Sequence, residues 1–259
     1  MNSERIRVAI LGANGRMGQI LSHQFLGDPV FELVARIDAR SDAGEFSVMA
    51  ISDIAQAPAF DILVDFSTPS ATESVYESMR GRKAAWLVAT TGLSDRVREK
   101  LQSLSESQPI LIAANTSLGI ALMQRLARQA AAILKDWDCE IVETHHRNKV
   151  DAPSGTAKAI AEAIADARKT KERQTVFVTE RAQRREVRPE AEIGISSLRG
   201  GTVAGEHRAI WLGEHEQFEI RHTAESREIF ANGARKMASW LVAQKPGMYS
   251  IQQWLDAIL

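Results

Sequence analysis

A glycine-rich turn between a short apolar run and a helical segment most constrains the fold of this chain. Residues 5–11 predict a buried strand, and the turn Gly12-Ala-Asn-Gly-Arg-Met-Gly18 leads directly into a helix that ends near Phe25. Glycines allow a tight turn and a close approach of the backbone to a ligand, while the first N–H groups of a helix attract anions. The turn therefore predicts an open parallel sheet with an anion-binding corner at the end of its first strand.

An acidic residue after the next predicted strand makes this corner more specific. Asp38 directly follows strand 31–37, where a carboxylate accepts hydrogen bonds from a ribose diol. The glycine spacing is G-x-x-G-x-x-G, because Ala13 stands where the more common G-x-G-x-x-G pattern has its first glycine. A glycine turn without a ligand is the simpler alternative. The predicted dinucleotide site consists of Gly12, Ala13, Asn14, Gly15, Arg16, Met17 and Asp38.

Short apolar runs alternate with helical segments throughout the first half of the chain. This pattern is typical of a Rossmann-type doubly wound parallel sheet with helices on both faces. We expect residues 1–115 to form a dinucleotide-binding domain, with 227–259 packing back on it. The further predicted strands are 31–37, 61–66, 85–90 and 110–114, and the further predicted helices are 70–80 and 94–104.

The second half changes character, because three predicted strands follow one another closely. Closely spaced strands with glycine turns are typical of a mixed or antiparallel sheet. We therefore predict a second, α+β domain over 116–226, in which the charged excursion 168–189 is solvated. The other predicted elements are helix 120–134, strand 138–145, helix 157–167, and strands at 175–179, 193–198, 202–212 and 217–223.

Three loops follow predicted strands at the sheet edge where open α/β folds bind ligands. They are Phe66-Ser-Thr-Pro69, Ala89-Thr-Thr-Gly92 and Ala113-Ala-Asn-Thr116. Taken one at a time, these residues are equally well explained as turn formers and helix caps. The predicted cofactor contacts are Ala89, Thr90, Thr91, Ala113, Ala114, Asn115 and Thr116.

The stretch from Glu143 to Thr156 combines two histidines, an arginine, a lysine and a predicted helix start. A helix N-terminus binds a carboxylate or phosphate, and an imidazole exchanges a proton near neutral pH. The stretch therefore predicts an anion site with a proton donor. The alternatives are a structural histidine, a solvated lysine and a simple helix cap. The candidate residues are His145, His146, Lys149, Ser154, Gly155 and Thr156.

Composition limits the partners that this chain can have. Its 259 residues hold 32 Lys and Arg against 33 Asp and Glu, so neither nucleic acid nor an anionic membrane is expected as a partner. Neither a signal peptide nor a long apolar run is evident, and we expect a cytoplasmic protein.

The single cysteine, Cys139, excludes an internal disulfide. No metal is expected, because the neighbouring His145 and His146 point to opposite faces of a strand and have no obvious third ligand.

Together, these segments resemble the 4-hydroxy-tetrahydrodipicolinate reductase (dihydrodipicolinate reductase) family of the diaminopimelate route to lysine. The resemblance covers nearly the whole chain, and His-His-Arg-Asn-Lys-Val-Asp-Ala-Pro-Ser-Gly-Thr at 145–156 is its most specific segment. The other similar segments are Gly-Ala-Asn-Gly-Arg-Met-Gly at 12–18, Asp-Phe-Ser-Thr-Pro at 65–69, Thr-Thr-Gly at 90–92, Asn-Thr-Ser-Leu-Gly at 115–119 and Arg-Gly-Gly-Thr-Val-Ala-Gly-Glu-His at 199–207.

The resemblance implies NAD(P)H-dependent reduction of a small cyclic dicarboxylate, 4-hydroxy-tetrahydrodipicolinate, to tetrahydrodipicolinate with loss of water. It implies that His145 is the general acid that protonates the ring carbon next to the one receiving hydride, and that Lys149 is a second proton donor. It also implies that the domain over 116–226 binds substrate and joins a homotetramer through its sheets. The implied clamp on a substrate carboxylate is His146 with Ser154, Gly155 and Thr156.

Cofactor choice depends on the residues around Asp38. An adenosine 2′-phosphate would be repelled by this carboxylate unless a cation moved in, and Arg40 is better placed for that than Arg36. We therefore expect NADH to bind at least as well as NADPH. Thr116 stands where many family members have a phenylalanine and Ala89 where a glycine is usual, so the nicotinamide environment is expected to be altered. Ala39 stands where members that favour a 2′-phosphate often have an arginine. Asn148 replaces a frequent histidine, and the segment 40–50 is short for the family.

Two other functions fit part of the pattern. One is another two-domain nicotinamide oxidoreductase, such as an aspartate-semialdehyde or homoserine type, although a thiol-dependent enzyme needs a more accessible cysteine than Cys139. The other is a non-catalytic dinucleotide sensor, which would have no reason to keep His145 and Lys149 beside a helix start. The resemblance places Glu206-His207 near the substrate site, but the pair is equally well interpreted as an exposed ladder pair on a strand. The resemblance also places Arg227 near the cofactor, and the simpler alternative is a cation that starts the last long helix.

Overall fold

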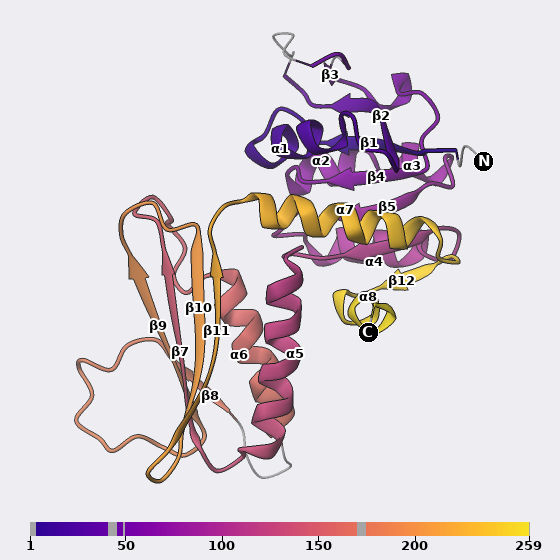
Figure 1. The fold of residues 1–259 in the computed structure, drawn as a ribbon. Coiled ribbons are helices and arrows are strands. Elements are labelled where there is room, and N and C mark those ends of the chain that lie inside the picture. The colour runs from indigo at the N-terminus through magenta and orange to yellow at the C-terminus, as the bar shows by residue number, and fades with distance from the viewer. Residues whose placement is uncertain (1–3, 41–45, 49, 170–174, 259) are drawn as a thin grey trace. The chain divides into compact units, whose positions relative to one another are not determined.

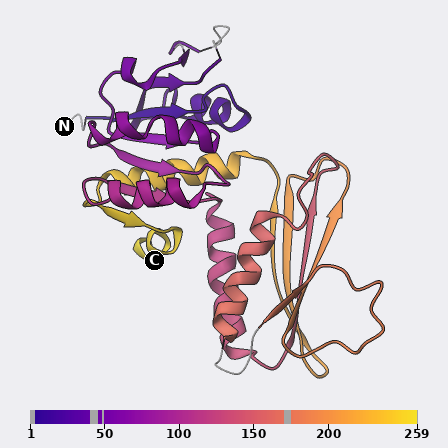
Figure 2. The ribbon, with the colours of Figure 1, turned by 180° about the vertical axis from the view of Figure 1, so that it is seen from behind.

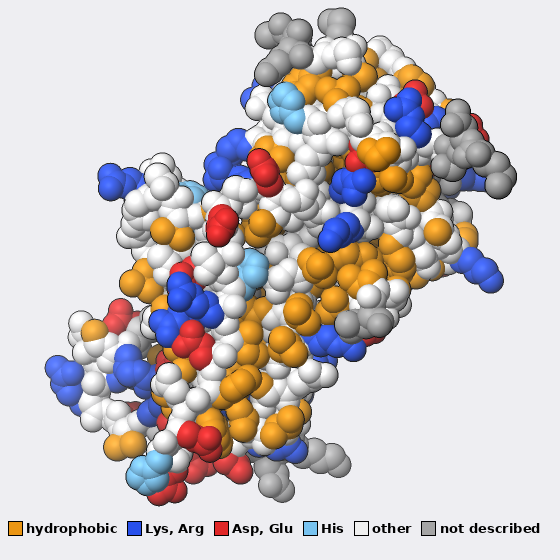
Figure 3. Space-filling view, in the orientation of Figure 1, with side chains coloured by type: hydrophobic (Ala, Val, Ile, Leu, Met, Phe, Trp, Pro, Cys, Tyr) orange, Lys and Arg blue, Asp and Glu red, His pale blue; other side chains and the backbone are white. Residues whose placement is uncertain are grey.

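The computed structural model describes residues 4–40, 46–48, 50–169 and 175–258. The chain divides into two compact units (Figures 1 and 2): unit 1 comprises Met1–Ser117 and Glu228–Leu259, and unit 2 comprises Leu118–Arg227. No helix in the described part of the chain is long and apolar enough to cross a membrane. On the face shown in Figure 3, side chains of both charge signs are interspersed, as expected for nearly balanced charges.

Unit 1 is built on a seven-stranded sheet in the order β12-β6-β5-β4-β1-β2-β3, and all neighbouring strands are parallel. The strand order reverses between β1 and β4, which is where open α/β sheets bind ligands. The strands are β1 (Ile6–Leu11), β2 (Phe31–Ile37), β3 (Ala50–Ile51), β4 (Ile62–Asp65), β5 (Ala85–Val88), β6 (Pro109–Ile112) and β12 (Gly247–Tyr249).

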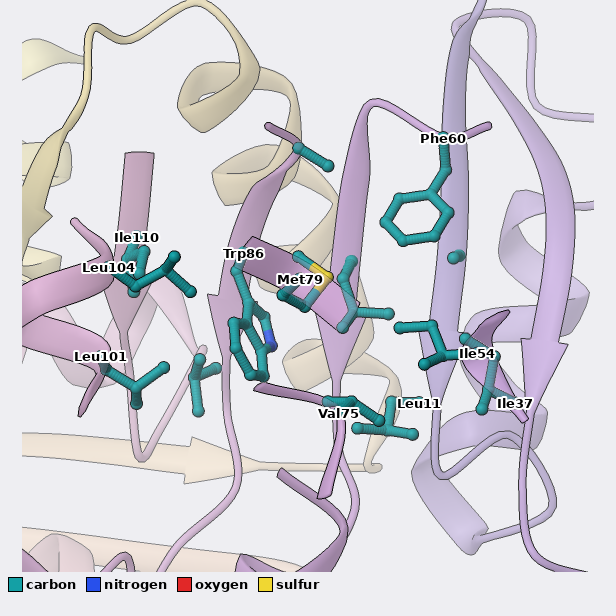
Figure 4. Close-up of a cluster of buried hydrophobic side chains, with 14 of the residues drawn as sticks. Leu11, Ile37, Ile54, Phe60, Val75, Met79, Trp86, Leu101, Leu104 and Ile110 are labelled. Atoms are coloured by element: carbon teal, nitrogen blue, oxygen red, sulfur yellow. The ribbon is translucent and has the colours of Figure 1, made fainter. Parts of the chain in front are cut away.

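Helices cover both faces of this sheet (Figures 1 and 2). On one face, α1 (Arg16–Phe25) contacts α7 (Glu228–Val242). The other face packs against α2 (Pro69–Ser74), α3 (Tyr76–Arg80) and α4 (Asp95–Leu104), and the last helix is α8 (Ile251–Ala257). Figure 4 shows the buried cluster between that face and its helices, where Met79, Trp86 and Ile110 are fully buried. Strands buried on both faces read as continuous apolar runs, which explains how the sequence predicted them.

Unit 2 has a five-stranded mixed sheet in the order β11-β10-β7-β9-β8. The strand β10 is antiparallel to both of its neighbours, while β9 is parallel to β7 and β8. The helices α5 (Leu118–Ile133) and α6 (Gly155–Arg168) pack on one face and enclose an apolar core. The strands are β7 (Asp138–His145), β8 (Val176–Val178), β9 (Glu192–Arg199), β10 (Gly205–Leu212) and β11 (Gln217–Ala224).

The predicted fold class is confirmed, with differences at a few elements. The predicted helix 70–80 is two short helices that meet at Val75. The predicted strand 202–212 begins only at Gly205, because the preceding residues form a turn in which Gly201 has a positive φ of 53°. The strands β3 and β12 were not predicted, since two or three residues carry no periodic signal.

The described part of the charged excursion 168–189 is largely exposed, as the sequence suggested, but it is not free of the sheet. Residues 170–174 lie outside the described residues, but the part after them is tied to the sheet by ion pairs. Arg188 Nη1 lies 2.5 Å from Asp138 Oδ1, and its Nε lies 3.1 Å from Glu140 Oε1. Arg184 Nη1 lies 2.7 Å from Glu192, a carboxylate with 1% exposure. The arginines of this segment therefore hold it to β7 and β9. Most of the segment 40–50, which looked short for the family, also lies outside the described residues.

Candidate functional site

The glycine turn after β1 has a conformation that only glycine tolerates at two of its positions. Gly12 has a φ of +82°, and a Cβ there would lie 2.7 Å from the carbonyl oxygen of Phe66. A Cβ on Gly18 would overlap the carbonyl oxygen of Gly12. The turn, the start of α1 and the loop after β4 are therefore in direct backbone contact, which glycine at positions 12 and 18 allows.

Backbone hydrogen bonds show which residues of the turn are available to a ligand. The N–H groups of Gly12 and Ala13 donate to the Ile37 carbonyl at 2.8 and 3.2 Å. The N–H of Gly15 donates to Gly12 at 3.0 Å, so these groups hold the turn itself. Among the described residues, no side chain caps α1. The first-turn N–H groups of Arg16 and Met17 are therefore the ones that an anion would meet.

Asp38 closes the corner at the end of β2. Its side chain is 10% exposed, and its carboxylate accepts hydrogen bonds from the N–H groups of Asn14 and Arg40, both at 3.0 Å. Arg36 is fully buried and donates to Asn14 Oδ1 at 2.9 Å and to Ser22 Oγ at 3.1 Å. Arg40, in contrast, has a side chain that is 71% exposed. Of the two arginines, Arg40 is thus the one at the surface near Asp38.

A buried carboxylate that was not predicted as a site residue organises the next two loops. Asp65, with no exposed surface, accepts hydrogen bonds from the Thr72 and Thr90 hydroxyls, both at 2.7 Å, and from Ser67 N–H at 3.0 Å and Oγ at 2.6 Å. Burial raises the pKa of Asp65 above its usual value, although these hydrogen bonds oppose the shift. The hydroxyl of Thr90, a predicted cofactor contact, is therefore used to join the two loops.

The predicted residues after β5 and β6 differ in exposure. Ala89 and Ala113 are buried, while Thr91 and Ala114 are exposed. Asn115 Oδ1 accepts the N–H of Ser117 at 2.9 Å. These two loops therefore offer only part of their predicted surface to a ligand.

Thr116, at the position of a frequent family phenylalanine, packs inside unit 1. It is 1% exposed, and its hydroxyl donates to the Phe230 carbonyl in α7 at 2.7 Å. A Cβ on Gly233 would overlap the Thr116 carbonyl oxygen. The departure at Thr116 is thus accommodated by a close backbone contact with α7.

In unit 2, the helix-facing side of the sheet changes from apolar to polar along its strands. Near the start of β7 this side carries the core residues Cys139 and Ile141. Further along, Glu143 is paired in register with His207 of β10 and Ser197 of β9. The polar cluster lies beside Ser154, the N-cap of α6. The predicted anion site is therefore the polar end of a layer that is otherwise hydrophobic core.

Glu143 is the centre of this cluster and is completely buried. It accepts two hydrogen bonds from Arg199, both at 2.8 Å, and one from the Ser154 N–H at 3.1 Å. Its Oε2 lies 2.5 Å from His145 Nδ1. Burial opposes ionisation, but hydrogen bonds from Arg199, Ser197, His145 and Ser154 outweigh it and lower the pKa of Glu143 to about 2. Glu143 is therefore ionised at any neutral pH.

His145 is 8% exposed and lies between Glu143 and His207. Its ring meets the His207 ring edge to face, with centroids 5.2 Å apart. A Cβ on Gly205 would lie 3.1 Å from His145 Nε2. Burial lowers the pKa of His145 below its usual value, with the Glu143 carboxylate acting in the opposite direction.

Ser154 connects the start of α6 to this pair of histidines. Its Oγ accepts the N–H of Ala157 at 3.2 Å and lies 3.2 Å from His207 Nε2. His207 is 4% exposed, and its Nδ1 has no hydrogen-bond partner among the described residues. Burial, followed by the charge on His145, lowers the pKa of His207 to about 4. His207 is therefore neutral near pH 7, where its Nε2 accepts the Ser154 O–H if the proton of the ring is on Nδ1.

The other predicted residues of this stretch lie at its edge. His146 is half-buried, and its N–H donates to the Val203 carbonyl at 2.8 Å. Lys149 Nζ forms an ion pair with Asp151 at 2.8 Å, and this pair lowers the pKa of Asp151. Gly155 and Thr156 begin α6, with Gly155 exposed. The lysine is thus a paired cation, and the helix start is accessible.

Sequence reasoning missed three members of this cluster: Glu143, Arg199 and His207. The interpretation of His207 as part of an exposed ladder pair is wrong, because its ring faces α6 and is buried. Alternation along β7 could have placed Glu143 on the same face as His145. The contacts with Arg199 and His207 depend on strand pairing, which the sequence does not reveal. Within the described ranges, no group of three or more His, Cys, Asp or Glu residues could hold a metal ion.

A Rossmann-type unit with an open glycine turn, followed by a unit with a buried imidazole–carboxylate pair, defines a two-unit nicotinamide-dependent oxidoreductase. Residues 6–116 match the family described as dihydrodipicolinate reductase, N-terminus, and residues 119–255 match dihydrodipicolinate reductase, C-terminus. The chain belongs to the dihydrodipicolinate reductase family, which confirms the resemblance seen in the sequence.

Individual relatives agree with this assignment. The chain is 40% identical to the 4-hydroxy-tetrahydrodipicolinate reductase of Caldanaerobacter subterraneus subsp. tengcongensis, with 95% of this chain and 97% of that protein covered. It is 38% identical to the protein of the same name from Zymomonas mobilis subsp. mobilis, covering 96% and 97%. A solved structure of dipicolinate-bound dihydrodipicolinate reductase from Paenisporosarcina sp. TG-14 is similar with a TM-score of 0.76 at 27% identity, covering 95% and 98%.

Proposed function

We propose that this chain catalyses the NAD(P)H-dependent reduction of 4-hydroxy-tetrahydrodipicolinate to tetrahydrodipicolinate with loss of water, a step of lysine and diaminopimelate biosynthesis. The observation that carries the proposal is the His145 imidazole, which lies beside the helix start of α6 with Nδ1 against an ionised carboxylate. Family membership over nearly the whole chain supports the same reaction. The substrate is a small cyclic dicarboxylate.

The residues of unit 2 have separate roles in this proposal. His145 donates a proton to the ring carbon next to the reduced one, and Lys149 acts as a second proton donor. His146 and the first residues of α6, Ser154, Gly155 and Thr156, bind a substrate carboxylate. The N–H groups at the start of α6 suit an anion, and Lys149 adds positive charge once its pairing with Asp151 is relaxed.

The glycine turn of unit 1 fits a nicotinamide dinucleotide. A glycine turn that packs directly against neighbouring backbone, and an uncapped helix start among the described residues, suit a pyrophosphate. When bound, the nicotinamide supplies the hydride. In the proposal, the turn residues Gly12 to Met17 hold the pyrophosphate, and Asp38 accepts the ribose hydroxyls. The contributions of Ala89 to Thr91 and Ala113 to Thr116 are contacts with the rest of the cofactor.

For the cofactor preference, we propose that NADH serves at least as well as NADPH. The Asp38 carboxylate is held in place by two N–H groups and would repel a 2′-phosphate, while the exposed Arg40 offers partial compensation. Purified protein should therefore show a kcat/KM for NADPH that does not exceed the value for NADH by more than about tenfold, or about 1.4 kcal/mol. Steady-state kinetics with both cofactors test this.

We also propose that the protein is cytoplasmic and forms a homotetramer through the sheet of unit 2. In support, α5 and α6 pack on one face of this sheet (Figure 1), and a second sheet could cover the other face. Light scattering coupled to size-exclusion chromatography would give the mass of the assembly directly. A monomer of 28.6 kDa would contradict this part of the proposal.

The proposed reaction is tested by following NADH oxidation by the purified protein in the presence of the condensation product of pyruvate and aspartate semialdehyde. Substrate-dependent turnover is expected. Binding of NADH without turnover would favour the dinucleotide-sensor alternative. A thiol-dependent dehydrogenase is disfavoured by Cys139, because burial raises the pKa of its thiol to about 12.

The role of His145 has its own test. The substitution His145→Gln should lower kcat by about 10² or more, because glutamine cannot donate a proton to carbon. The Kd for NADH, measured by fluorescence titration, should stay within about twofold of the wild-type value, well under 1.4 kcal/mol. A variant with wild-type turnover would show that His145 is structural.

A further inference from the structure

We infer that Glu143 is a positioning residue for His145, whose carboxylate holds the imidazole in one orientation and one tautomer through a hydrogen bond from Nδ1–H. The inference rests on the proposed proton-donor role of His145. Glu143 had no predicted role, and a positioning role accounts for a carboxylate buried at the start of α6.

The Glu143 carboxylate is held in place by hydrogen bonds from outside its own strand. Its side chain has no exposed surface, and two other segments of the chain hold its two oxygens. Arg199 donates from β9 to both oxygens at 2.8 Å, and the Ser154 N–H donates from the residue before α6 at 3.1 Å. A carboxylate fixed in this way points its remaining acceptor capacity in one direction, toward His145 Nδ1 at 2.5 Å.

At the contact between Glu143 and His145, the carboxylate must accept a hydrogen bond and Nδ1–H must donate it. The bidentate Arg199 pair keeps Glu143 ionised, since its pKa is lowered to about 2 despite burial. An ionised carboxylate has acceptors only. The Nδ1 of His145 therefore carries a proton in both charge states of the ring. Nε2 is then the nitrogen that gains and loses the proton, in the same way that a carboxylate fixes the tautomer of a histidine that binds a metal.

A glycine lies next to Nε2 of His145, on the side of the ring away from Glu143. Gly205 on β10 comes close to this nitrogen, and a Cβ at that position would lie 3.1 Å from it. Glycine therefore avoids a tight contact on the proton-exchanging side of the ring, while His207 packs against the ring at a centroid distance of 5.2 Å. Glu143 orients the ring from one side, and Gly205 keeps the other side open.

Charged groups from several segments set the protonation of His145. Removing the charge of Glu143 would leave the cations unbalanced, so the protonated ring would become less stable and its pKa would fall. The groups that face His145 are Glu143 of β7, Arg199 of β9, His207 of β10 and, from the segment before α6, Lys149 with its partner Asp151.

The substitution Glu143→Gln tests the inference, because it removes the charge with almost no change of volume. We expect kcat to fall about 10- to 100-fold, while the Kd for NADH stays unchanged. The alkaline limb of the pH profile of kcat/KM should move to lower pH. A loss of rate without a shift of that limb would indicate a purely structural role and overturn the inference.

The chain offers a matched control in Glu219→Gln. Glu219 is also held by an arginine through two contacts, Arg208 Nε at 2.8 Å and Nη2 at 2.6 Å, but it lies on β11, away from His145. Its substitution removes an arginine-paired carboxylate from the same sheet, so kcat and the pH profile of kcat/KM should stay at wild-type values, with light scattering used to check that the assembly is unchanged. Equal losses in both variants would attribute the effect to general destabilisation of the sheet and contradict a specific role of Glu143.

If Glu143→Gln does not fold, a measurement on the unmodified protein tests the expected tautomer of His145. Long-range ¹H–¹⁵N correlation spectra report which ring nitrogen of a neutral histidine carries the proton, and the His145 signals are identified by their loss in His145→Gln. We expect the proton on Nδ1, and a proton on Nε2 with bare Nδ1 would overturn the inference. Wild-type turnover in His145→Gln would instead contradict the proposed proton-donor role of His145, and the tautomer result would stand independently of it.

Discussion

The two candidate sites of this protein are formed by different kinds of chemical group. The corner after β1 is shaped by backbone: Gly12 has a positive φ, and neighbouring N–H groups bond to the Ile37 carbonyl. The polar end of the unit 2 sheet is made of buried ionisable side chains, in which Glu143 contacts Arg199 and His145. One site is determined by where side chains are missing, and the other by where charges are buried.

This difference predicts different weaknesses. Backbone groups do not titrate, so the glycine turn itself should be insensitive to pH but intolerant of a single added methyl group. The cluster of unit 2 should respond strongly to pH, because burial shifts the pKa values of His145 and His207 downward. Substitutions in the two regions should therefore give effects that are distinguishable in kind as well as in size.

The largest effect is expected from Gly12→Ala. An alanine at a φ of +82° is strained, and its Cβ would lie 2.7 Å from the Phe66 carbonyl oxygen. Strain of about 1–3 kcal/mol and a similar overpacking cost should lower the free energy of unfolding by about 4 kcal/mol. The turn can only relax by moving away from β4, so NADH affinity should fall about 10²-fold or more. Urea unfolding and fluorescence titration measure the two quantities.

Gly27→Ala is the matched control for this change. Gly27 has a similar φ of +77°, but a Cβ there would meet nothing within 4 Å among the described residues. The variant should lose about 1 kcal/mol of stability from φ strain and keep its NADH affinity. Equal loss of affinity in both variants would show that the close approach to Phe66 is unimportant.

The next largest effect concerns His207 and the pH dependence of stability. The folded-state pKa of about 4 lies below the ordinary value near 6.5, so between these values the unfolded chain binds a proton that the folded protein does not. Stability is therefore unaffected above pH 6.5 and falls as the pH drops toward 4, by a maximum of about 3 kcal/mol. Urea unfolding at pH 7 and pH 4.5 should show this loss in the wild type and much less of it in His207→Gln.

The exposed His215, whose side chain is 92% accessible, is the control for that measurement. His215→Gln should keep the wild-type pH dependence. Glu143 contributes to the pH dependence of stability over a lower pH range. Its lowered pKa stabilises the fold above about pH 4.5, and this contribution is lost as the pH falls toward 2. If His207→Gln kept the full loss between pH 6.5 and 4, burial of His207 would not be its cause.

A smaller effect is expected from Asp65→Asn, which changes the buried carboxylate that joins the loops after β4 and β5. An amide keeps one acceptor but replaces the other with a donor, so one or two of the bonds from Thr72 and Thr90 should weaken. The expected cost is about 1–3 kcal/mol of stability, with a reduction of NADH affinity by about threefold, or under 1 kcal/mol. The control is Asp53→Asn, at an exposed helix cap, which should leave NADH affinity unchanged. If Asp65→Asn also left NADH affinity unchanged, the loops that Asp65 joins would not contribute to cofactor binding.

The smallest effect is expected from Arg40→Ala. The Arg40 side chain is 71% exposed, and its Nε lies 3.4 Å from Asp38 Oδ1, so solvent screens its interactions. We expect NADPH affinity to fall by about two- to fivefold, or under 1 kcal/mol, with NADH affinity unchanged. Equal changes for both cofactors would show that Arg40 does not act on the 2′-phosphate.

Much of the fold could be predicted because most helices and strands are indicated by local patterns of apolar and polar residues. The strand β2 and the strand β7 have the predicted bounds, since a buried run and an alternating run are visible in the sequence itself. The break at Val75 and the short strand β12 were missed. A helix break of one residue and a three-residue strand depend on packing against neighbours, which leaves no periodic trace.

The sequence by itself determined the elements, the glycine turn and the histidine stretch with His145, because each is encoded by residues close together in the chain. Only the tertiary structure decided that Arg199 holds Glu143 and that His207 lies against His145, across strands paired through β7. These contacts join residues far apart in the chain, and strand order and register place them. Both are decided by burial of whole faces of a sheet, and no local pattern encodes them.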